Sequence, residues 1–126
     1  MPYKVLIIDD DEEILAELKE MIKASGYNVV TTDNGLKAFE LAKKERPDVI
    51  ITDLNMEGVN GYQLALAFKS HHLTKYIPVI IMTGYLGDEE SDKLKILLGN
   101  ERFLRKPFSP CDVTNKLLDI LSDKSR

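Results

Sequence analysis

Short apolar runs alternate along this chain with segments that have the periodicity of amphipathic helices. The runs occupy residues 5–8, 29–32, 49–52, 78–82 and 103–104. After the first run, one helix face is marked by the spacing of Ile14, Leu15, Leu18, Met21 and Ile22. Because strands that alternate with helices form parallel sheets joined by right-handed crossovers, the pattern predicts an α/β fold.

The other helices are predicted from similar patterns and from capping signals. The periodic segments are residues 35–45, 62–68 and 89–98. A last helix is expected to begin sharply, with Ser109 as N-cap, Pro110 at the first helical position and Asp112 at the third. With the helix after the first run, the sequence predicts five helices.

The polarity of the runs predicts where each strand lies in the sheet. The first, third and fourth runs are apolar without alternation, which is typical of strands covered by helices on both faces. The second and fifth runs are shorter or more polar, so we expect them at the edges. The resulting order of a five-stranded parallel sheet, 2-1-3-4-5, is that of doubly wound, flavodoxin-like folds, which bind ligands beyond the carboxyl ends of the strands.

Length and charge restrict the domain organisation and the possible ligands. With 126 residues, the chain is expected to form one domain over residues 1–126. No apolar run approaches the roughly 20 residues of a membrane helix, and no secretory signal is recognised, so we expect a cytoplasmic protein without membrane contact. The net charge of −4 argues against direct nucleic-acid binding, and the single cysteine, Cys111, excludes an internal disulfide.

Polar side chains follow four of the five predicted strands. They are, in chain order, Asp9, Asp10 and Asp11, then Asp53, then Thr83, and finally Lys106. The carboxyl ends of parallel strands meet at one edge of a sheet, where ligands of such folds bind. The predicted fold therefore gathers acids, a hydroxyl and a cation that are far apart in the sequence.

These residue types indicate metal-assisted phosphoryl transfer. Crowded carboxylates repel one another unless a cation lies between them, and Mg²⁺ suits such a site because it accepts one or two carboxylates together with waters or phosphate oxygens. Asp53, on a central strand, is best placed to act as the nucleophile that forms an acyl phosphate. Lys106 can pair with one phosphoryl oxygen, and the Thr83 hydroxyl can donate a hydrogen bond to another.

Four segments of the chain resemble the successive motifs of the response regulator receiver family. They are residues 7–11 (Ile-Ile-Asp-Asp-Asp), residues 52–56 with Gly61, residues 82–84 (Met-Thr-Gly) and residues 103–108 (Phe-Leu-Arg-Lys-Pro-Phe). Each motif is weak alone, but all four in this order are highly specific, and the resemblance covers the whole chain. It implies a phosphoacceptor of two-component signalling that assists its own phosphorylation and dephosphorylation and is not a turnover enzyme.

The resemblance implies the metal ligands and the phosphoacceptor. Asp53 is expected to accept the phosphoryl group and, together with Asp10, to ligate Mg²⁺. Asp9 is expected to orient metal-bound water, and the backbone carbonyl of Asn55 is expected to be a further ligand.

The resemblance also implies a switch. Thr83 and Lys106 are expected to sense the phosphoryl group, and Phe103 falls on the position of the switch aromatic. A strained or cis peptide bond is expected before Pro107.

Two residues depart from the family pattern. Glu57 stands where the family usually has proline and is followed by Gly58, so we expect a more mobile loop and an extra acid near the site. Gly84 replaces the common alanine after the switch threonine and leaves more room there.

The resemblance implies protein partners at two surfaces. The phosphodonor is expected to be a histidine kinase or a histidine phosphotransfer protein that docks on the exposed part of the first helix. The output is expected to pass to a downstream protein or to an effector domain absent from this chain. A homodimer through the fourth helix, fifth strand and fifth helix is possible, and partners could meet Lys93, Lys95, Arg102 and Arg105 there.

Three other functions compete with this interpretation. A haloacid-dehalogenase-like phosphohydrolase could use Asp9 and Asp11, but no acidic pair follows the fourth strand. A flavin or nucleotide binder would need a loop of Gly, Ser or Thr after the first strand, where residues 9–13 are all acidic. A receiver-like interaction module that is never phosphorylated usually lacks one of the required acids or the lysine, and all are present here.

Two features have simpler structural interpretations. Among the adjacent acids, Asp11 is expected mainly to cap the first helix. His71 and His72 resemble a metal-binding pair, but adjacent positions on a helix do not face each other, so a solvated helix end is expected.

Overall fold

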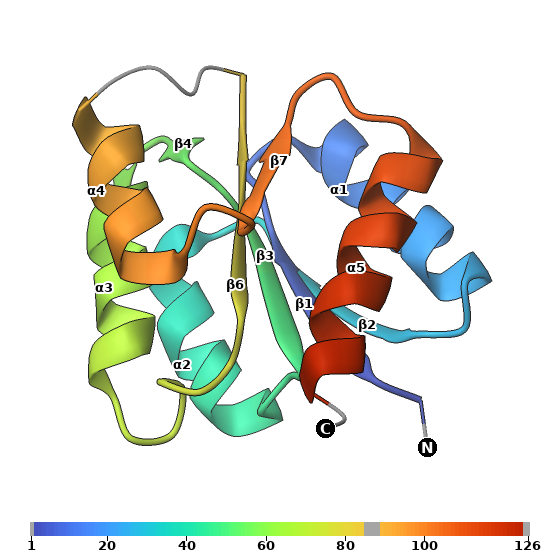
Figure 1. The fold of residues 1–126 in the computed structure, drawn as a ribbon, viewed down its shortest axis with the longest axis horizontal. Helices are drawn as coiled ribbons and strands as arrows, with labels where there is room; N and C mark the ends of the chain where they lie inside the picture. Colours follow the sequence, from blue (N-terminus) through green and yellow to red (C-terminus); the bar gives the residue numbers. More distant parts are fainter. Residues whose placement is uncertain (1, 85–88, 125–126) are drawn as a thin grey trace.

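A computed structural model of the chain describes residues 2–84 and 89–124, and it confirms the alternation of strands and helices (Figure 1). The strands are β1 (Lys4–Ile8), β2 (Asn28–Thr32), β3 (Val49–Asp53), β4 (Asn55–Met56), β5 (Val59–Asn60), β6 (Val79–Thr83) and β7 (Phe103–Arg105). The helices are α1 (Glu12–Ala24), α2 (Gly35–Glu45), α3 (Gly61–Ser70), α4 (Glu89–Leu98) and α5 (Pro110–Lys124). Within the described ranges, none of these helices combines the length and apolar character that crossing a membrane requires.

The main sheet has five parallel strands in the order β2-β1-β3-β6-β7. Since β6 and β7 are the fourth and fifth predicted strands, the predicted order 2-1-3-4-5 is confirmed. Every residue of the central strands β3 and β6 is buried, whereas the edge strand β2 is only half-buried. The apolar runs therefore mark central strands because helices cover both of their faces.

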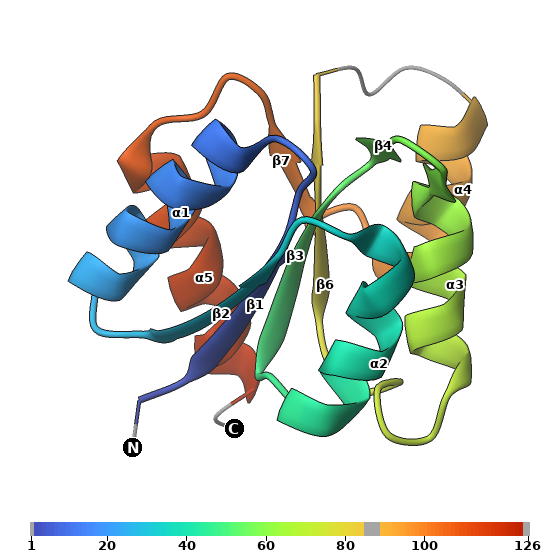
Figure 2. The ribbon, with the colours of Figure 1, turned by 180° about the vertical axis from the view of Figure 1, so that it is seen from behind.

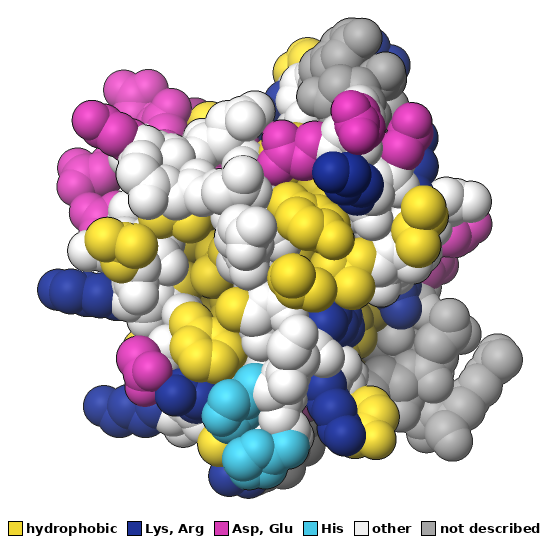
Figure 3. All heavy atoms as spheres, turned by 90° about the vertical axis from the view of Figure 1, so that its left-hand side faces the viewer, with side chains coloured by type: hydrophobic (Ala, Val, Ile, Leu, Met, Phe, Trp, Pro, Cys, Tyr) yellow, Lys and Arg dark blue, Asp and Glu magenta, His cyan; other side chains and the backbone are white. Residues whose placement is uncertain are grey.

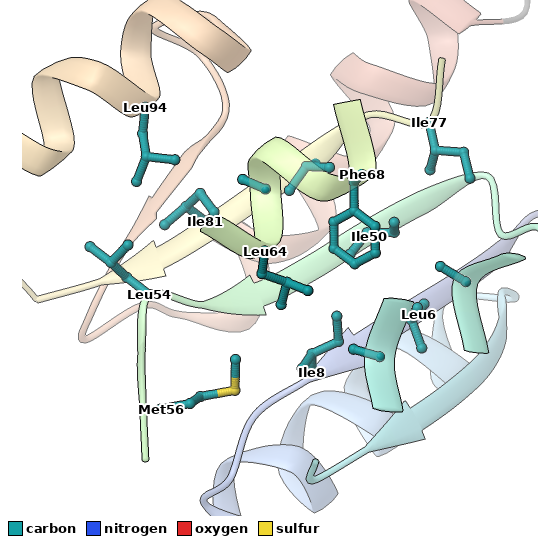
Figure 4. Close-up of a cluster of buried hydrophobic side chains, with 14 of the residues drawn as sticks. Leu6, Ile8, Ile50, Leu54, Met56, Leu64, Phe68, Ile77, Ile81 and Leu94 are labelled. Atoms are coloured by element: carbon teal, nitrogen blue, oxygen red, sulfur yellow. The ribbon is translucent and has the colours of Figure 1, made fainter. Parts of the chain in front are cut away.

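Helices cover the sheet on both sides, with α1 and α5 on one face and α2, α3 and α4 on the other (Figures 1 and 2). Alternate residues of β1 serve the two cores, because successive side chains of a strand point to opposite faces. Val5 and Ile7 pack with α1 and α5, while Leu6 and Ile8 pack under α2 and α3. The second of these cores is drawn in Figure 4.

The boundaries differ from the predicted ones mainly at strand ends. β3 includes Asp53 and β6 includes Thr83, because the parallel pairing continues as far as Asp53 opposite Met82 and Thr83 opposite Arg105. Helix α3 is longer than predicted and begins at Gly61.

The predicted start of α5 is confirmed. Ser109 and Asp112 exchange hydrogen bonds, since the Ser109 amide donates to Asp112 Oδ2 at 2.9 Å and the Asp112 amide donates to Ser109 Oγ at 3.2 Å.

A short antiparallel hairpin, which the sequence analysis missed, connects β3 to α3. Its strands β4 and β5 pair through Asn55 with Asn60 and Met56 with Val59, so Glu57 and Gly58 form the turn. The loop at Glu57 and Gly58 is therefore the turn of a paired hairpin, and its greater mobility stays a prediction. Two-residue strands have no periodicity from which they could be predicted.

The expectation that His71 and His72 lie at a helix end is confirmed, but the expectation that they do not face each other is wrong. Helix α3 ends at Ser70, and His71 takes an extended conformation as its C-cap. The helical spacing therefore no longer applies, and the two rings stack at a centroid distance of 4.6 Å. Figure 3 shows both histidines at the bottom of the molecule and most of the visible acidic side chains toward its top. In Figure 1, which has the same vertical axis, the carboxyl ends of the strands also point toward the top.

Candidate functional site

Three carboxylates meet beyond the carboxyl ends of the neighbouring strands β1 and β3. Asp9 directly follows β1, Asp10 comes next, and Asp53 ends the neighbouring strand β3. Each offers an oxygen, and these oxygens all lie within 4.8 Å of one another. Asp9 is fully buried and Asp53 is 8% exposed, whereas Asp10 is exposed. The predicted acidic cluster is thus formed, and its three carboxylates differ in exposure to solvent.

Asp9 is the most constrained of the three. Its Oδ1 accepts a hydrogen bond from the Asp11 amide at 2.9 Å, but its buried Oδ2 has no hydrogen-bond partner among the described residues. Burial raises the pKa of Asp9, and the neighbouring charges of Asp53 and Asp10 raise it further, against the opposing effects of the Asp11 amide and Lys106. An unsatisfied buried carboxylate oxygen beside two other carboxylates is the environment that a hard divalent cation stabilises. The residues present therefore fit Mg²⁺.

Lys106 brings positive charge to the cluster. Its Nζ lies 3.2 Å from Asp53 Oδ1 and 3.7 Å from Asp9 Oδ2. The backbone amide of Lys106 donates to the Thr83 carbonyl at 2.8 Å, so the two residues are tied together at the ends of β6 and β7. The peptide bond between Lys106 and Pro107 is cis, as the family resemblance implied.

The two expected switch residues are both buried. Thr83 is 2% exposed and follows Met82, which pairs with Asp53 across the sheet. Phe103 is 8% exposed and packs into the core beneath α3 and α4, opposite Ile81 in the register of β6 and β7. Thr83 therefore lies on β6, the strand next to β3, and Phe103 lies on β7, the strand next to β6.

Asp11 and Asn55 lie near the cluster without contributing a carboxylate to it. Asp11 caps α1, because its side chain accepts hydrogen bonds from the Glu13 and Ile14 amides, which confirms the predicted capping role. Asn55 is exposed at the start of the hairpin, and its carbonyl as a metal ligand stays a prediction.

One contact of the site was not foreseen. The backbone amide of Glu57 donates a hydrogen bond to Asp10 Oδ2 at 3.0 Å. Every residue except proline has a backbone N–H, so a hydrogen bond from a backbone amide cannot be predicted from the type of its residue. The replacement of the family's usual proline by Glu57 is the one sequence signal that could have indicated this hydrogen bond.

Comparisons with known proteins agree with this geometry. The family model described as "Response regulator receiver domain" matches residues 5–118. The chain is 36% identical over 111 residues to the polar-differentiation response regulator DivK of Brucella anthropi, covering 86% of this chain and 88% of DivK. It is 34% identical over 122 residues to the alkaline phosphatase synthesis transcriptional regulatory protein PhoP of Bacillus subtilis, covering 96% of this chain but 49% of PhoP.

Solved structures show the same likeness. The chemotaxis protein CheY4 of Vibrio cholerae superimposes with a TM-score of 0.86 at 29% identity, covering 95% of this chain and 99% of that chain. Fold, acidic cluster, lysine and sequence relatives thus agree, and the chain belongs to the response regulator receiver domain family of two-component signalling.

Proposed function

We propose that Asp53 accepts a phosphoryl group from a phosphorylated histidine of a kinase or phosphotransfer protein, with Mg²⁺ bound beside it. The observation that carries this proposal is the 3.2 Å contact of Lys106 Nζ with Asp53 Oδ1 inside a cluster of three carboxylates. The Asp53 side chain keeps 11% exposure, so a phosphodonor can reach it from solvent.

The transfer requires one bond to form and one to break. A carboxylate oxygen of Asp53 bonds to phosphorus, the bond from phosphorus to the donor nitrogen breaks, and the released imidazole takes up a proton. Lys106 neutralises charge on one phosphoryl oxygen, and the Thr83 hydroxyl donates a hydrogen bond to another.

The metal would be held by the oxygens that the fold gathers. Asp10 and Asp53 supply carboxylate oxygens, the Asn55 carbonyl supplies a further ligand, and Asp9 orients metal-bound water. Mg²⁺, when bound, supplies positive charge against the charge on the transferring phosphoryl group.

A chemical phosphodonor tests the assignment directly. Acetyl phosphate with Mg²⁺ should add one phosphoryl group, measured by intact mass spectrometry, and Asp53→Asn should abolish the addition. Asp33→Asn is the matched control, because Asp33 follows the edge strand β2 and lies outside the cluster. Labelling that persists in Asp53→Asn, or that maps to another residue of the unsubstituted protein, would refute the role of Asp53.

A separate turnover assay with a generic phosphate ester distinguishes a phosphoacceptor from an enzyme. We propose that the chain takes up one phosphoryl group per molecule and does not turn over phosphate esters. A haloacid-dehalogenase-like phosphohydrolase would instead release phosphate repeatedly from a generic phosphate ester in the presence of Mg²⁺.

The donor is proposed to dock beside α1. A groove of about 210 Å³ lies between α1 and the segment that follows β7, and its lining includes Ile14, Leu18, Met21, Pro107 and Phe108. Lys106 also lines this groove, so a donor seated there is next to the residue that contacts Asp53. We propose that this reaction takes place in the cytoplasm.

The output is proposed to use the surface formed by α4, β7 and α5. Ile96 on α4 is 88% exposed and Leu118 on α5 is 55% exposed, so apolar side chains are available for a downstream protein, an effector domain or a second copy. The nearby Lys93 and Lys95 pair with acids of their own helix, at 3.8 and 4.0 Å, and such surface pairs contribute little to stability. Nucleic-acid contact is not part of this proposal.

A further inference from the structure

The turn of the β4–β5 hairpin contacts the acidic cluster through the polypeptide backbone. The Glu57 amide donates to Asp10 Oδ2 at 3.0 Å, although the two residues are 47 positions apart. Asp10 is the exposed member of the cluster, so its side chain has less surrounding structure to orient it than Asp9 or Asp53. This hydrogen bond therefore bears directly on where the Asp10 carboxylate points.

The geometry of the turn explains why this amide is available. Gly58 has a φ of +73°, whereas Glu57 is not among the described residues with positive φ. Negative φ followed by positive φ is the pattern of a type II turn, in which proline is common at the first central position. The family usually has proline at this position, and proline has no N–H to donate. Glu57 thus supplies a donor that the usual residue lacks.

The hairpin that presents the amide is anchored to the core. Met56 is 7% exposed and belongs to the cluster drawn in Figure 4, where it lies near Ile8. Val59 packs so closely on Gly35 that an added Cβ there would lie 2.8 Å from Val59 Cγ2. Because the packing of Met56 and Val59 holds the hairpin in place, the Glu57 amide between them can fix the position of the Asp10 carboxylate.

We propose that the Glu57 amide is a positioning group that orients the Asp10 carboxylate for Mg²⁺. This inference rests on the proposed metal site. One carboxylate oxygen of Asp10 can ligate the cation while the other accepts from Glu57, so the ligand is oriented before the metal arrives. Partners of metal ligands typically change affinity by about 10–100-fold when they are removed. Because Asp10 is exposed, we expect an effect near the lower end, about tenfold.

Two substitutions of the same residue separate the amide from the side chain. Glu57→Pro removes the N–H and the carboxylate, whereas Glu57→Ala removes the carboxylate and keeps the N–H. The type II turn accommodates proline at this position. Mg²⁺ affinity, measured by isothermal titration calorimetry, should be about tenfold weaker in Glu57→Pro than in Glu57→Ala.

A metal-free measurement supplies an independent readout. The Glu57 amide should exchange its hydrogen more slowly in the unsubstituted protein than in Asp10→Ala, where the acceptor is missing. Equal exchange rates would overturn the inference even if Glu57→Pro failed to fold.

The outcomes distinguish the two proposals. If the unsubstituted protein binds Mg²⁺ and the proline and alanine variants bind it equally well, the positioning role is refuted and the metal site stands. If the unsubstituted protein binds no Mg²⁺, the proposed function itself fails.

Discussion

Removing the charge of Asp9 should stabilise the metal-free protein. Asp9→Asn has nearly the same shape, keeps an oxygen that can accept from the Asp11 amide, and replaces the unsatisfied Oδ2 with a nitrogen donor. The carboxylates of Asp53 and Asp10 lie beside Asp9, so the substitution removes the repulsion between these carboxylates, but it also removes the attraction of Asp9 Oδ2 for Lys106 Nζ at 3.7 Å.

The magnitude follows from the distances in the cluster. With an effective dielectric constant of about 20, repulsion between Asp9 and Asp53, whose oxygens lie within 4.8 Å of each other, is at least about 3.5 kcal/mol. Attraction between Asp9 Oδ2 and Lys106 Nζ at 3.7 Å is about 4.5 kcal/mol at the same dielectric constant. Repulsion from the exposed Asp10 is screened by water to about 1 kcal/mol. These contributions nearly cancel.

What remains is the cost of burying an ionised carboxylate at a fully buried position. That cost is several kcal/mol, and the hydrogen bond from the Asp11 amide offsets about 1.5–3 kcal/mol of it. We therefore expect Asp9→Asn to raise the free energy of unfolding by about 2 kcal/mol, which corresponds to about 8 °C in Tm for a chain of this size.

Thermal melts in EDTA, followed by circular dichroism, measure this change. Asp10→Asn is the matched comparison and should gain less than about 1 kcal/mol, because Asp10 is exposed. Added Mg²⁺ should raise the Tm of the unsubstituted protein, since it binds the folded state, and should raise it less in both variants. A folded Asp9→Asn that melts below the unsubstituted protein in EDTA would refute the reasoning.

Three further predictions follow from other parts of the fold. Gly61→Ala should lower the free energy of unfolding by about 2 kcal/mol in a urea titration, because the added Cβ overlaps the Leu54 carbonyl. Gly84→Ala should not, because no described atom lies within 4 Å of the added Cβ, and equal midpoints of the two variants would contradict this. The pKa of His71 is lowered by partial burial and by the positive charges of His72 and Lys43, so the folded state binds fewer protons than the unfolded one. The free energy of unfolding should therefore fall as the pH is lowered through 6.5, the pKa of His71 in the unfolded chain. The Tm of His71→Asn should depend less steeply on pH than the Tm of the unsubstituted protein. Phe103 is buried and has no hydroxyl, so we expect the unphosphorylated, metal-bound protein to sample its active form at roughly 3–15%, and flat relaxation-dispersion profiles at Phe103 would disprove this.

The order of the strands and the end of the sheet that bears the acids could be predicted from the sequence. Continuous apolar runs identify central strands because only helix-covered strands are buried on both faces. Parallel crossovers then place the residues that follow each strand at one edge, so Asp9, Asp53 and Lys106 were expected together before any distance was known. The start of α5 was equally predictable, because the capping exchange between Ser109 and Asp112 involves residues only three positions apart.

Only the tertiary structure decided how the three carboxylates differ and what orients them. Asp9 and Asp10 are adjacent in the sequence, yet one is fully buried and the other exposed, because burial depends on elements packed from elsewhere in the chain. The hydrogen bond from Glu57 to Asp10 joins a hairpin without periodicity to a loop 47 residues away. A local pattern reports on neighbours along the chain, whereas this contact depends on the packing of the hairpin against the core, which no single segment contains.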